Sequence, residues 1–272
     1  MSEDTFISHL VELRDRLLRS LIAILVIFAC LFPWASELYD VLASPMMQTL
    51  PAGSKMIATG VITPFLIPVK VAMMIAFLIA LPYVLYQAWS FVAPGLYSHE
   101  KKLVLPLVVA STVLFLLGIT FCYFFVFGVV FAFVNKIAPA SITVAPDIEQ
   151  YLNFVLTMFL AFGVTFEVPI VVIILAKMGV VTIQQLKQIR PYFIVGSFVI
   201  AAIVTPPDVI SQLLLAIPMC LLYELGLFLA RFVAKPKTED DDYRLPSDVE
   251  MDRELDRIDA ERKGGESVSG KS

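Results

Sequence analysis

The chain has 272 residues, of which 59% are hydrophobic and 16% charged. An ordinary soluble domain is about 45–50% apolar and about 25% charged, and several apolar runs here exceed the roughly 18 residues that indicate a bilayer-spanning helix. The composition therefore excludes a soluble globular protein. It predicts an all-α, polytopic integral membrane protein.

The formal net charge of −4 arises from the last residues of the chain and not from its apolar part. Residues 236–272 hold 12 acidic and seven basic side chains, whereas the preceding 235 residues carry a net charge of +1. Segments with few large apolar groups and much charge cannot bury enough surface to fold alone. Residues 235–272 are therefore expected to form an acidic, mostly disordered tail.

The apolar runs predict a membrane domain at residues 17–234, preceded by a short interfacial helix at residues 1–16. Apolar residues at positions 6, 10, 13 and 17 give that first segment its helical spacing. The long connection at residues 35–70 is rich in proline and glycine but also apolar, so an ordered cap is expected there. Six spans are expected, at residues 17–32, 71–91, 103–134, 151–176, 191–204 and 209–229.

The fifth expected span is short against the roughly 20 residues that a bilayer normally requires. It predicts either local thinning of the bilayer or a helix that ends below one surface. Residues 205–208 alone separate it from the sixth span.

An even number of spans places both termini on one side of the membrane. Eleven basic residues of the membrane domain and its flanks fall on that side, and only Lys55, Lys70 and Lys136 fall on the other. Short cytoplasmic loops carry an excess of Lys and Arg. Both termini are therefore expected in the cytoplasm.

A charged island at residues 97–102 separates two long uncharged runs and contains Glu100 beside two lysines. Glu12, near the N-terminus, is expected at the same cytoplasmic surface. If the two carboxylates meet, they could accept two guanidinium groups through charge-assisted bidentate bonds, which lysine cannot form. The alternative is that each is a solvated surface carboxylate with a basic neighbour, and the sequence leaves both interpretations open.

Glu167 is the acidic residue placed well inside an expected span. An ionised carboxylate in hydrocarbon is costly, so it should face protein or water or be protonated. Two interpretations follow: a polar contact with a partner helix or substrate path, or an internal hydrogen bond that only orders the bundle. Glu224 lies nearer the end of its span, where a structural role is expected.

No signature of an enzyme appears among the common catalytic and nucleotide-binding motifs. The three cysteines lie inside apolar runs, His9 and His99 form no cluster with them, and no basic aromatic surface suggests nucleic acid. The sequence thus predicts no catalytic residue, no cofactor and no metal. A proton-coupled secondary transporter that uses Glu167 is the competing function, although such proteins commonly show internal repeats and none is evident here.

In order and spacing, several segments resemble the TatC family, the large subunit of the twin-arginine protein translocase. The resemblance covers about residues 5–234 and leaves out the acidic tail. It is carried by HLVELR at residues 9–14, WSFVAPGLY at 89–97 and FGVTFEVP at 162–169, with shorter matches at 43–45, 99–100, 190–192 and 205–208.

This resemblance implies a receptor in the bacterial inner membrane for folded preproteins whose signal peptides bear paired arginines. It implies an oligomeric complex with single-span TatA- and TatB-type subunits, driven by the proton-motive force and not by ATP. The resemblance assigns signal-peptide binding to Glu12, Glu100, Arg14 and Phe91. It assigns partner contact or assembly to Pro45, Glu167, Thr205, Asp208 and Gln212.

Overall fold

The computed structural model describes residues 3–49, 56–92, 104–137, 146–205 and 208–233. The chain divides into two units, residues 1–234 and 235–272. All that follows concerns the first unit, because the expected acidic tail lies outside the described residues.

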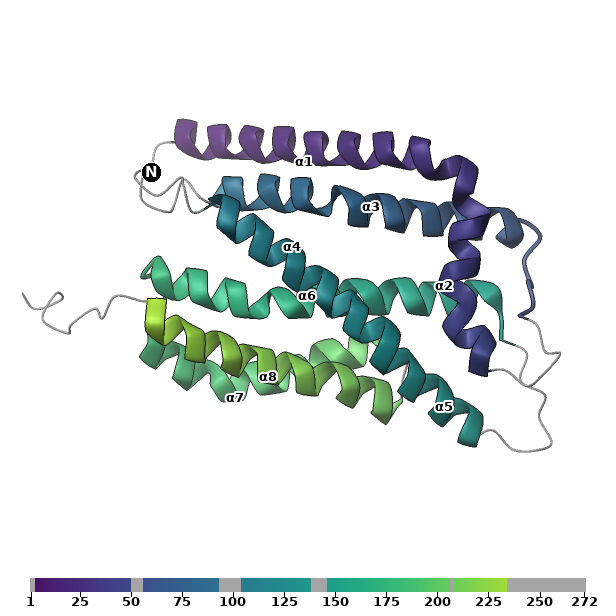
Figure 1. Ribbon diagram of the computed structural model, residues 1–272. Helices are drawn as coiled ribbons and strands as arrows, with labels where there is room; N and C mark the ends of the chain where they lie inside the picture. Colours follow the sequence, from purple (N-terminus) through teal and green to yellow (C-terminus); the bar gives the residue numbers. More distant parts are fainter. Residues whose placement is uncertain (1–2, 50–55, 93–103, 138–145, 206–207, 234–272) are drawn as a thin grey trace, which may run out of the picture. The chain divides into compact units, whose positions relative to one another are not determined.

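The described part of the chain is mainly helical, with short connections and an isolated bridge between Ile57 and Asp147. Six helical stretches are long and apolar enough to cross a membrane, which confirms the all-α, six-span expectation (Figure 1). The elements are α1 (Glu3–Leu31), the 3-10 turn η1 (Phe32–Trp34), α2 (Ala35–Thr49), α3 (Thr63–Val92), α4 (Val104–Phe121), the π-helical turn η4 (Cys122–Val126), α5 (Phe127–Ile137), α6 (Ile148–Lys177), α7 (Ile183–Val204) and α8 (Val209–Val233).

The N-terminal half of the unit differs from expectation in two ways. Helix α1 runs without a break through residues 3–31, so the expected interfacial segment and the first span share one helix. Helix α3 begins at Thr63, eight residues before the expected second span. Proline is compatible with the first turn of a helix, where a backbone N–H has no intrahelical partner, so Pro64 does not prevent this early start.

The expectation of a short fifth span is wrong. Helix α7 has 22 residues, which corresponds to about 33 Å at 1.5 Å per residue and is long enough to cross a bilayer. It begins early because Thr182 and Gln185 form a reciprocal capping box, with the Thr182 hydroxyl accepting from the Gln185 N–H at 3.2 Å. Bilayer thinning therefore has no support from the length of this helix.

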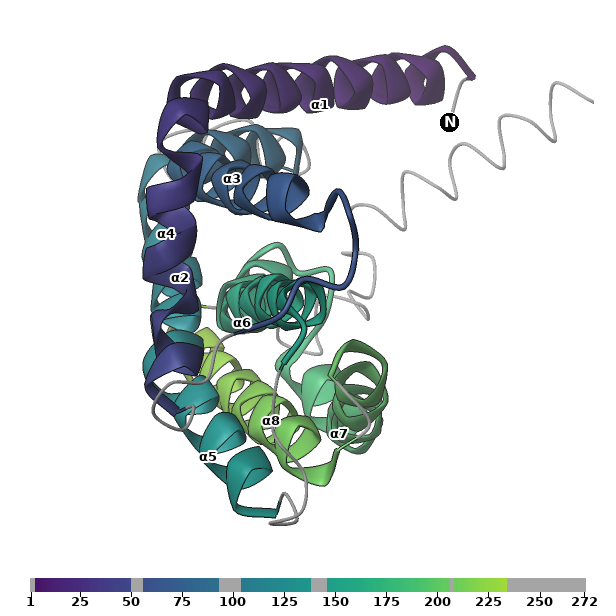
Figure 2. The same cartoon turned by 90° about the vertical axis from the view of Figure 1, so that its right-hand side faces the viewer.

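Helix α6 packs against both α4 and α8, while α1 lies along α3 and α7 along α8 (Figures 1 and 2). The core between them is built from large buried side chains that include Phe127, Met158 and Phe162. Helices approach closely in membranes where small residues replace side chains at the contact. A Cβ on Gly118 of α4 would lie 2.6 Å from the Phe162 carbonyl oxygen, and one on Gly226 of α8 would lie 2.8 Å from the Pro169 Cα.

The start of α6 is tied to the segment before α3. The Asp147 side chain caps α6 by accepting from the backbone N–H groups of Glu149 and Gln150, and it also accepts from the Thr59 hydroxyl at 2.6 Å. These hydrogen bonds, the one from Thr59 first, lower the pKa of Asp147. Tyr151 donates to the Leu42 carbonyl oxygen of α2 at 3.2 Å, so the described part of the expected cap is ordered, as predicted.

The glycine contact of α4 with α6 can be tested with a matched pair of substitutions. Gly118→Ala should destabilise the protein by about 1–3 kcal/mol, because the added methyl group meets the α6 backbone. Gly128→Ala, on α5 of the same span, adds the same methyl group where nothing lies within 4 Å and should stabilise slightly through helix propensity. Thermal unfolding in one detergent would measure both, and equal melting temperatures would contradict the packing described.

Candidate functional site

The candidate site lies where the first turns of α1 meet the end of α3. The His9 ring stacks on the Phe91 ring with centroids 4.2 Å apart and an interplanar angle of 17°. Both residues project from the facing sides of two helices that pack along their length. This contact places Phe91, one of the predicted site residues, beside the N-terminal part of α1.

One turn further along α1, Glu12 is held by Arg16. Arg16 donates from Nε at 2.9 Å and from Nη2 at 2.6 Å to the same oxygen, Glu12 Oε1. Residues four apart face each other on a helix surface, and Arg16 also reaches α3, where its Nη1 donates to Gln87 Oε1 at 3.4 Å. Glu12 is thus fixed in position while 39% of its side chain remains exposed.

The other charged residues of this surface are more open. Arg14 donates from Nε at 2.9 Å and Nη2 at 2.8 Å to its neighbour Asp15, and 66% of its side chain is exposed. Glu100 lies outside the described residues, so its distance from Glu12 stays a prediction. Within the described part, Glu12 is a surface carboxylate with a basic neighbour, as the simpler of the two sequence interpretations has it.

Glu167 lies on α6 with both carboxylate oxygens buried and without a hydrogen-bond partner among the described residues. The Ser111 hydroxyl of α4 lies beside the carboxylate. Ser111 is itself fully buried and accepts from Trp89 Nε1 of α3 at 2.9 Å, which leaves its hydroxyl hydrogen for another acceptor. Both interpretations of Glu167, a partner contact and an internal hydrogen bond, therefore stay predictions.

The predicted polar residues around the turn between α7 and α8 are satisfied within their own segment. The Thr205 hydroxyl donates to the Ala201 carbonyl oxygen at 2.8 Å, and Asp208 Oδ1 accepts from the Ser211 N–H at 2.7 Å. Gln212 Nε2 donates to the Phe198 carbonyl oxygen at 3.2 Å. These groups shape the turn, while Pro45 is placed only as a member of α2 because its side chain is outside the described set.

Some residues of the site were not predicted from the sequence. The pair Glu12–Arg16 has the spacing of a helical ion pair and could have been found from that signal. Gln87 and the Trp89–Ser111 contact depend on which helices pack together, and no local pattern indicates them. Glu224 has the structural role that was expected, since Arg190 Nη2 donates to its Oε2 at 2.7 Å.

Within the described residues, no group of three or more His, Cys, Asp or Glu side chains is placed to hold a metal ion. The fold and site together define a six-span membrane protein with a charged, aromatic surface at one end and a buried carboxylate in its interior.

The sequence profile of the family described as "Sec-independent protein translocase protein (TatC)" matches residues 8–218. The chain therefore belongs to the TatC family.

Relatives and a solved structure agree with this assignment. The chain is 50% identical over 234 residues to the Sec-independent protein translocase protein TatC of Haemophilus influenzae, covering 86% of this chain and 91% of that protein. It is 48% identical over 232 residues to the protein of that name from Escherichia coli K12, covering 85% and 90%. The crystal structure of the twin arginine translocase receptor TatC superposes with a TM-score of 0.74 at 41% identity, covering 83% of this chain and 99% of that one.

One similar protein is longer than this chain. The TatC protein of Halothiobacillus neapolitanus is 53% identical over 232 residues, which are 85% of this chain and 63% of that protein. This chain therefore spans somewhat less than two thirds of that relative.

The two intramembrane glutamates should respond oppositely to replacement by leucine. Glu167→Leu should stabilise the isolated chain by about 1–3 kcal/mol, because it removes a buried carboxylate without a partner. Glu224→Leu should destabilise it by less than about 1 kcal/mol, because it removes a half-exposed carboxylate whose partner, Arg190, is also partly exposed. Thermal unfolding of the isolated chain would measure both, and a loss of stability in Glu167→Leu would show that the carboxylate has a structural bond.

Proposed function

We propose that this chain is the receptor subunit of a twin-arginine translocase in a bacterial cytoplasmic membrane. Both termini lie in the cytoplasm, and the surface around Glu12 receives the paired arginines of signal peptides on folded preproteins. Membership of the TatC family supports this proposal. The observation that carries it is the Glu12 carboxylate, which is held in place by Arg16 yet partly exposed beside the His9–Phe91 stack.

The geometry of Glu12 suits an incoming guanidinium. Both bonds from Arg16 go to Oε1, and Oε2 therefore keeps its acceptor capacity for a ligand. A carboxylate whose rotamer is already fixed loses less entropy on binding. Charge-assisted bonds from a planar guanidinium fork are stronger and more directional than those from an ammonium group, which favours arginine over lysine in the ligand.

Glu100 supplies the second acceptor in this proposal, and Arg14 and Phe91 complete the surface. Phe91 and Glu100 are nine positions apart in the sequence, a length that reaches at most about 30 Å when extended. Glu100 is therefore within reach of the end of α3 that carries Phe91. Arg14, largely exposed, would meet the peptide backbone or its acidic groups.

Partner contact is proposed along the membrane part of the chain. Glu167 offers a buried carboxylate with no hydrogen-bond partner within the part of the chain that the structure describes, and such a group in a membrane interior is costly unless it is paired. We assign it to contact with single-span TatA- or TatB-type subunits. Thr205, Asp208 and Gln212 shape the turn where such helices dock, and Pro45 serves assembly into an oligomeric complex. The proton-motive force drives export, and neither a catalytic reaction nor nucleic acid is involved.

A proton-coupled secondary transporter is the second candidate, and the same unpartnered Glu167 favours it. It requires a solute path and, in many such folds, structural repeats around broken helices. The two candidates differ in a simple assay: a transporter moves small solutes in proteoliposomes without partner subunits, whereas a receptor does not.

The receptor proposal can be tested by photo-crosslinking a signal peptide from position 11, which is exposed on α1 next to Glu12. Peptides with paired arginines should crosslink at least tenfold more than peptides with paired lysines. Glu12→Gln and Glu100→Gln should each remove that preference, because each takes away an anionic acceptor.

Glu37→Gln provides the control, because it removes an exposed carboxylate on α2 at the far end of α1. This variant should leave the arginine preference unchanged. Equal crosslinking of both peptides to every variant would contradict the proposed site.

A further inference from the structure

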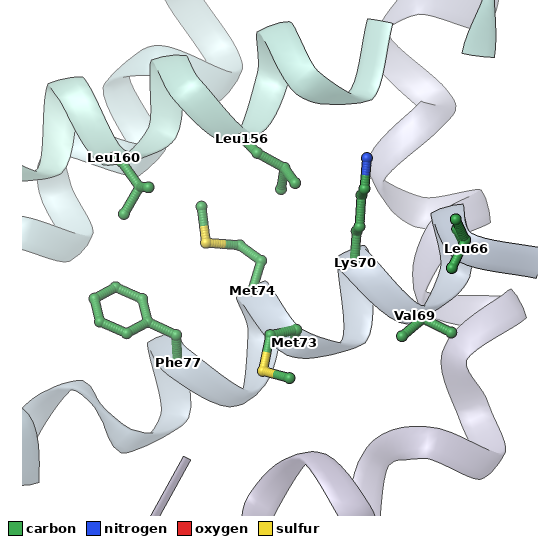
Figure 3. Close-up of a pocket in the computed structure, with 8 residues that line it drawn as sticks. All are labelled: Leu66, Val69, Lys70, Met73, Met74, Phe77, Leu156 and Leu160. Carbon is green, nitrogen blue, oxygen red and sulfur yellow. The ribbon is translucent and has the colours of Figure 1, made fainter. Parts of the chain in front are cut away.

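A groove of about 530 Å³ lies between α3 and α6, away from the site at Glu12. Its walls are apolar except for one residue, Lys70, and Figure 3 shows that side chain extending from α3 toward α6. Met74 and Phe77 lie on the same side of α3, with Leu156 and Leu160 of α6 opposite them. The full lining is Leu66, Val69, Lys70, Met73, Met74, Phe77, Leu156 and Leu160.

The groove has a polar end and an apolar end. Lys70 lies seven residues into α3, near the membrane surface at which α3 and α6 begin. From Lys70 to Phe77 the helix rises about 10 Å at 1.5 Å per residue. One leaflet of the hydrocarbon core is about 15 Å deep, so the groove follows the depth of a single leaflet.

The polar end carries both signs of charge. Lys70 Nζ lies 3.4 Å from Glu149 Oε1 and 3.2 Å from Asn153 Oδ1. An ammonium group has three donors, so one remains after these two contacts. Glu149 accepts from the Thr63 hydroxyl through its other oxygen at 3.0 Å, and 44% of its side chain is exposed, so it can accept a further bond from outside.

We propose that this groove binds one phospholipid with a phosphoethanolamine headgroup, from the leaflet in which α3 and α6 begin. One acyl chain lies along Met74, Phe77, Leu156 and Leu160. The phosphate accepts from Lys70, and the lipid ammonium donates to Glu149. The pair of opposite charges at the mouth matches the pair of opposite charges in this headgroup, whereas an anionic headgroup would meet Glu149 as a like charge.

The charges at the mouth favour a lipid over an apolar protein helix. Lys70 and Glu149 place opposite charges at one end of an otherwise apolar groove, and a zwitterionic headgroup above an acyl chain matches that arrangement.

The test uses the full chain in nanodiscs with a phosphatidylethanolamine that carries a photoreactive diazirine in its acyl chain. Labelling should map to the peptides containing Met73, Met74 and Leu160. Labelling should fall at least fivefold in Lys70→Gln, which removes the headgroup donor. It should fall by a similar factor in Leu160→Trp, which fills the groove. Glu149→Gln should remove the preference for unlabelled phosphatidylethanolamine over phosphatidylglycerol as competitor.

Two control variants keep the result specific. Lys136→Gln removes a cation from the exposed end of α5, and Leu117→Trp adds the same bulk to an exposed position of α4 outside the groove. Both should label like the unmodified chain, and all variants should unfold at similar temperatures.

The proposal is overturned if labelling is equal in all variants or if phosphatidylglycerol competes equally well with the unmodified chain. It is also overturned if the groove is labelled in the isolated chain but not in complexes extracted from membranes, because a protein helix would then be the occupant.

Discussion

Helix α6 is held at close range by α4 on one side and α8 on the other, and the glycines at these contacts fix where its polar groups lie. Lipid tails are as apolar as leucine, so helices in a bilayer gain little from burying apolar surface and depend on packing at short distance. Gly118 and Gly226 allow that approach to the α6 backbone near Phe162 and Pro169. The positions of α4 and α8 in the bundle therefore depend on their contacts with α6.

The polar groups of α6 fall into two environments. At its start, Asp147 and Glu149 are bonded to the segment before α3 and to α3 itself, which ties the connection after α2 to the helix. In its middle, Glu167 has no bond among the described residues. A helix so firmly placed holds this carboxylate in a defined position.

The surface around Glu12 is built on a different pair of helices. Helices α1 and α3 are joined by the His9–Phe91 stack and by Arg16, which bonds to both Glu12 and Gln87. Glu12 is thus oriented by its own helix and by the neighbouring one.

The number and class of the helices could be predicted from the sequence, because apolar runs of this length have few other solutions. The start of α7 could not be predicted from hydropathy, because five of the eight residues 183–190 are polar or charged and their helix begins at the Thr182 capping box. The π-helical turn at residues 122–126 carries no signal within a uniformly apolar run. Glu12 and Glu167 stood out by charge and position, but Gln87, Ser111 and Lys70 gained their roles only from contacts between helices.

The central claim is that Glu12 recognises an arginine of the ligand directly, and a double-mutant cycle tests it most directly. The affinity of the full chain in nanodiscs would be measured for a signal peptide with both arginines and for peptides with either arginine replaced by glutamine, each with the unmodified chain and with Glu12→Gln. Direct recognition predicts a coupling energy of about 1.5 kcal/mol or more between Glu12 and one arginine, as found for close charge pairs across interfaces. Additive effects, with coupling near zero for both arginines, would show that Glu12 is an ordinary surface charge and would contradict the account.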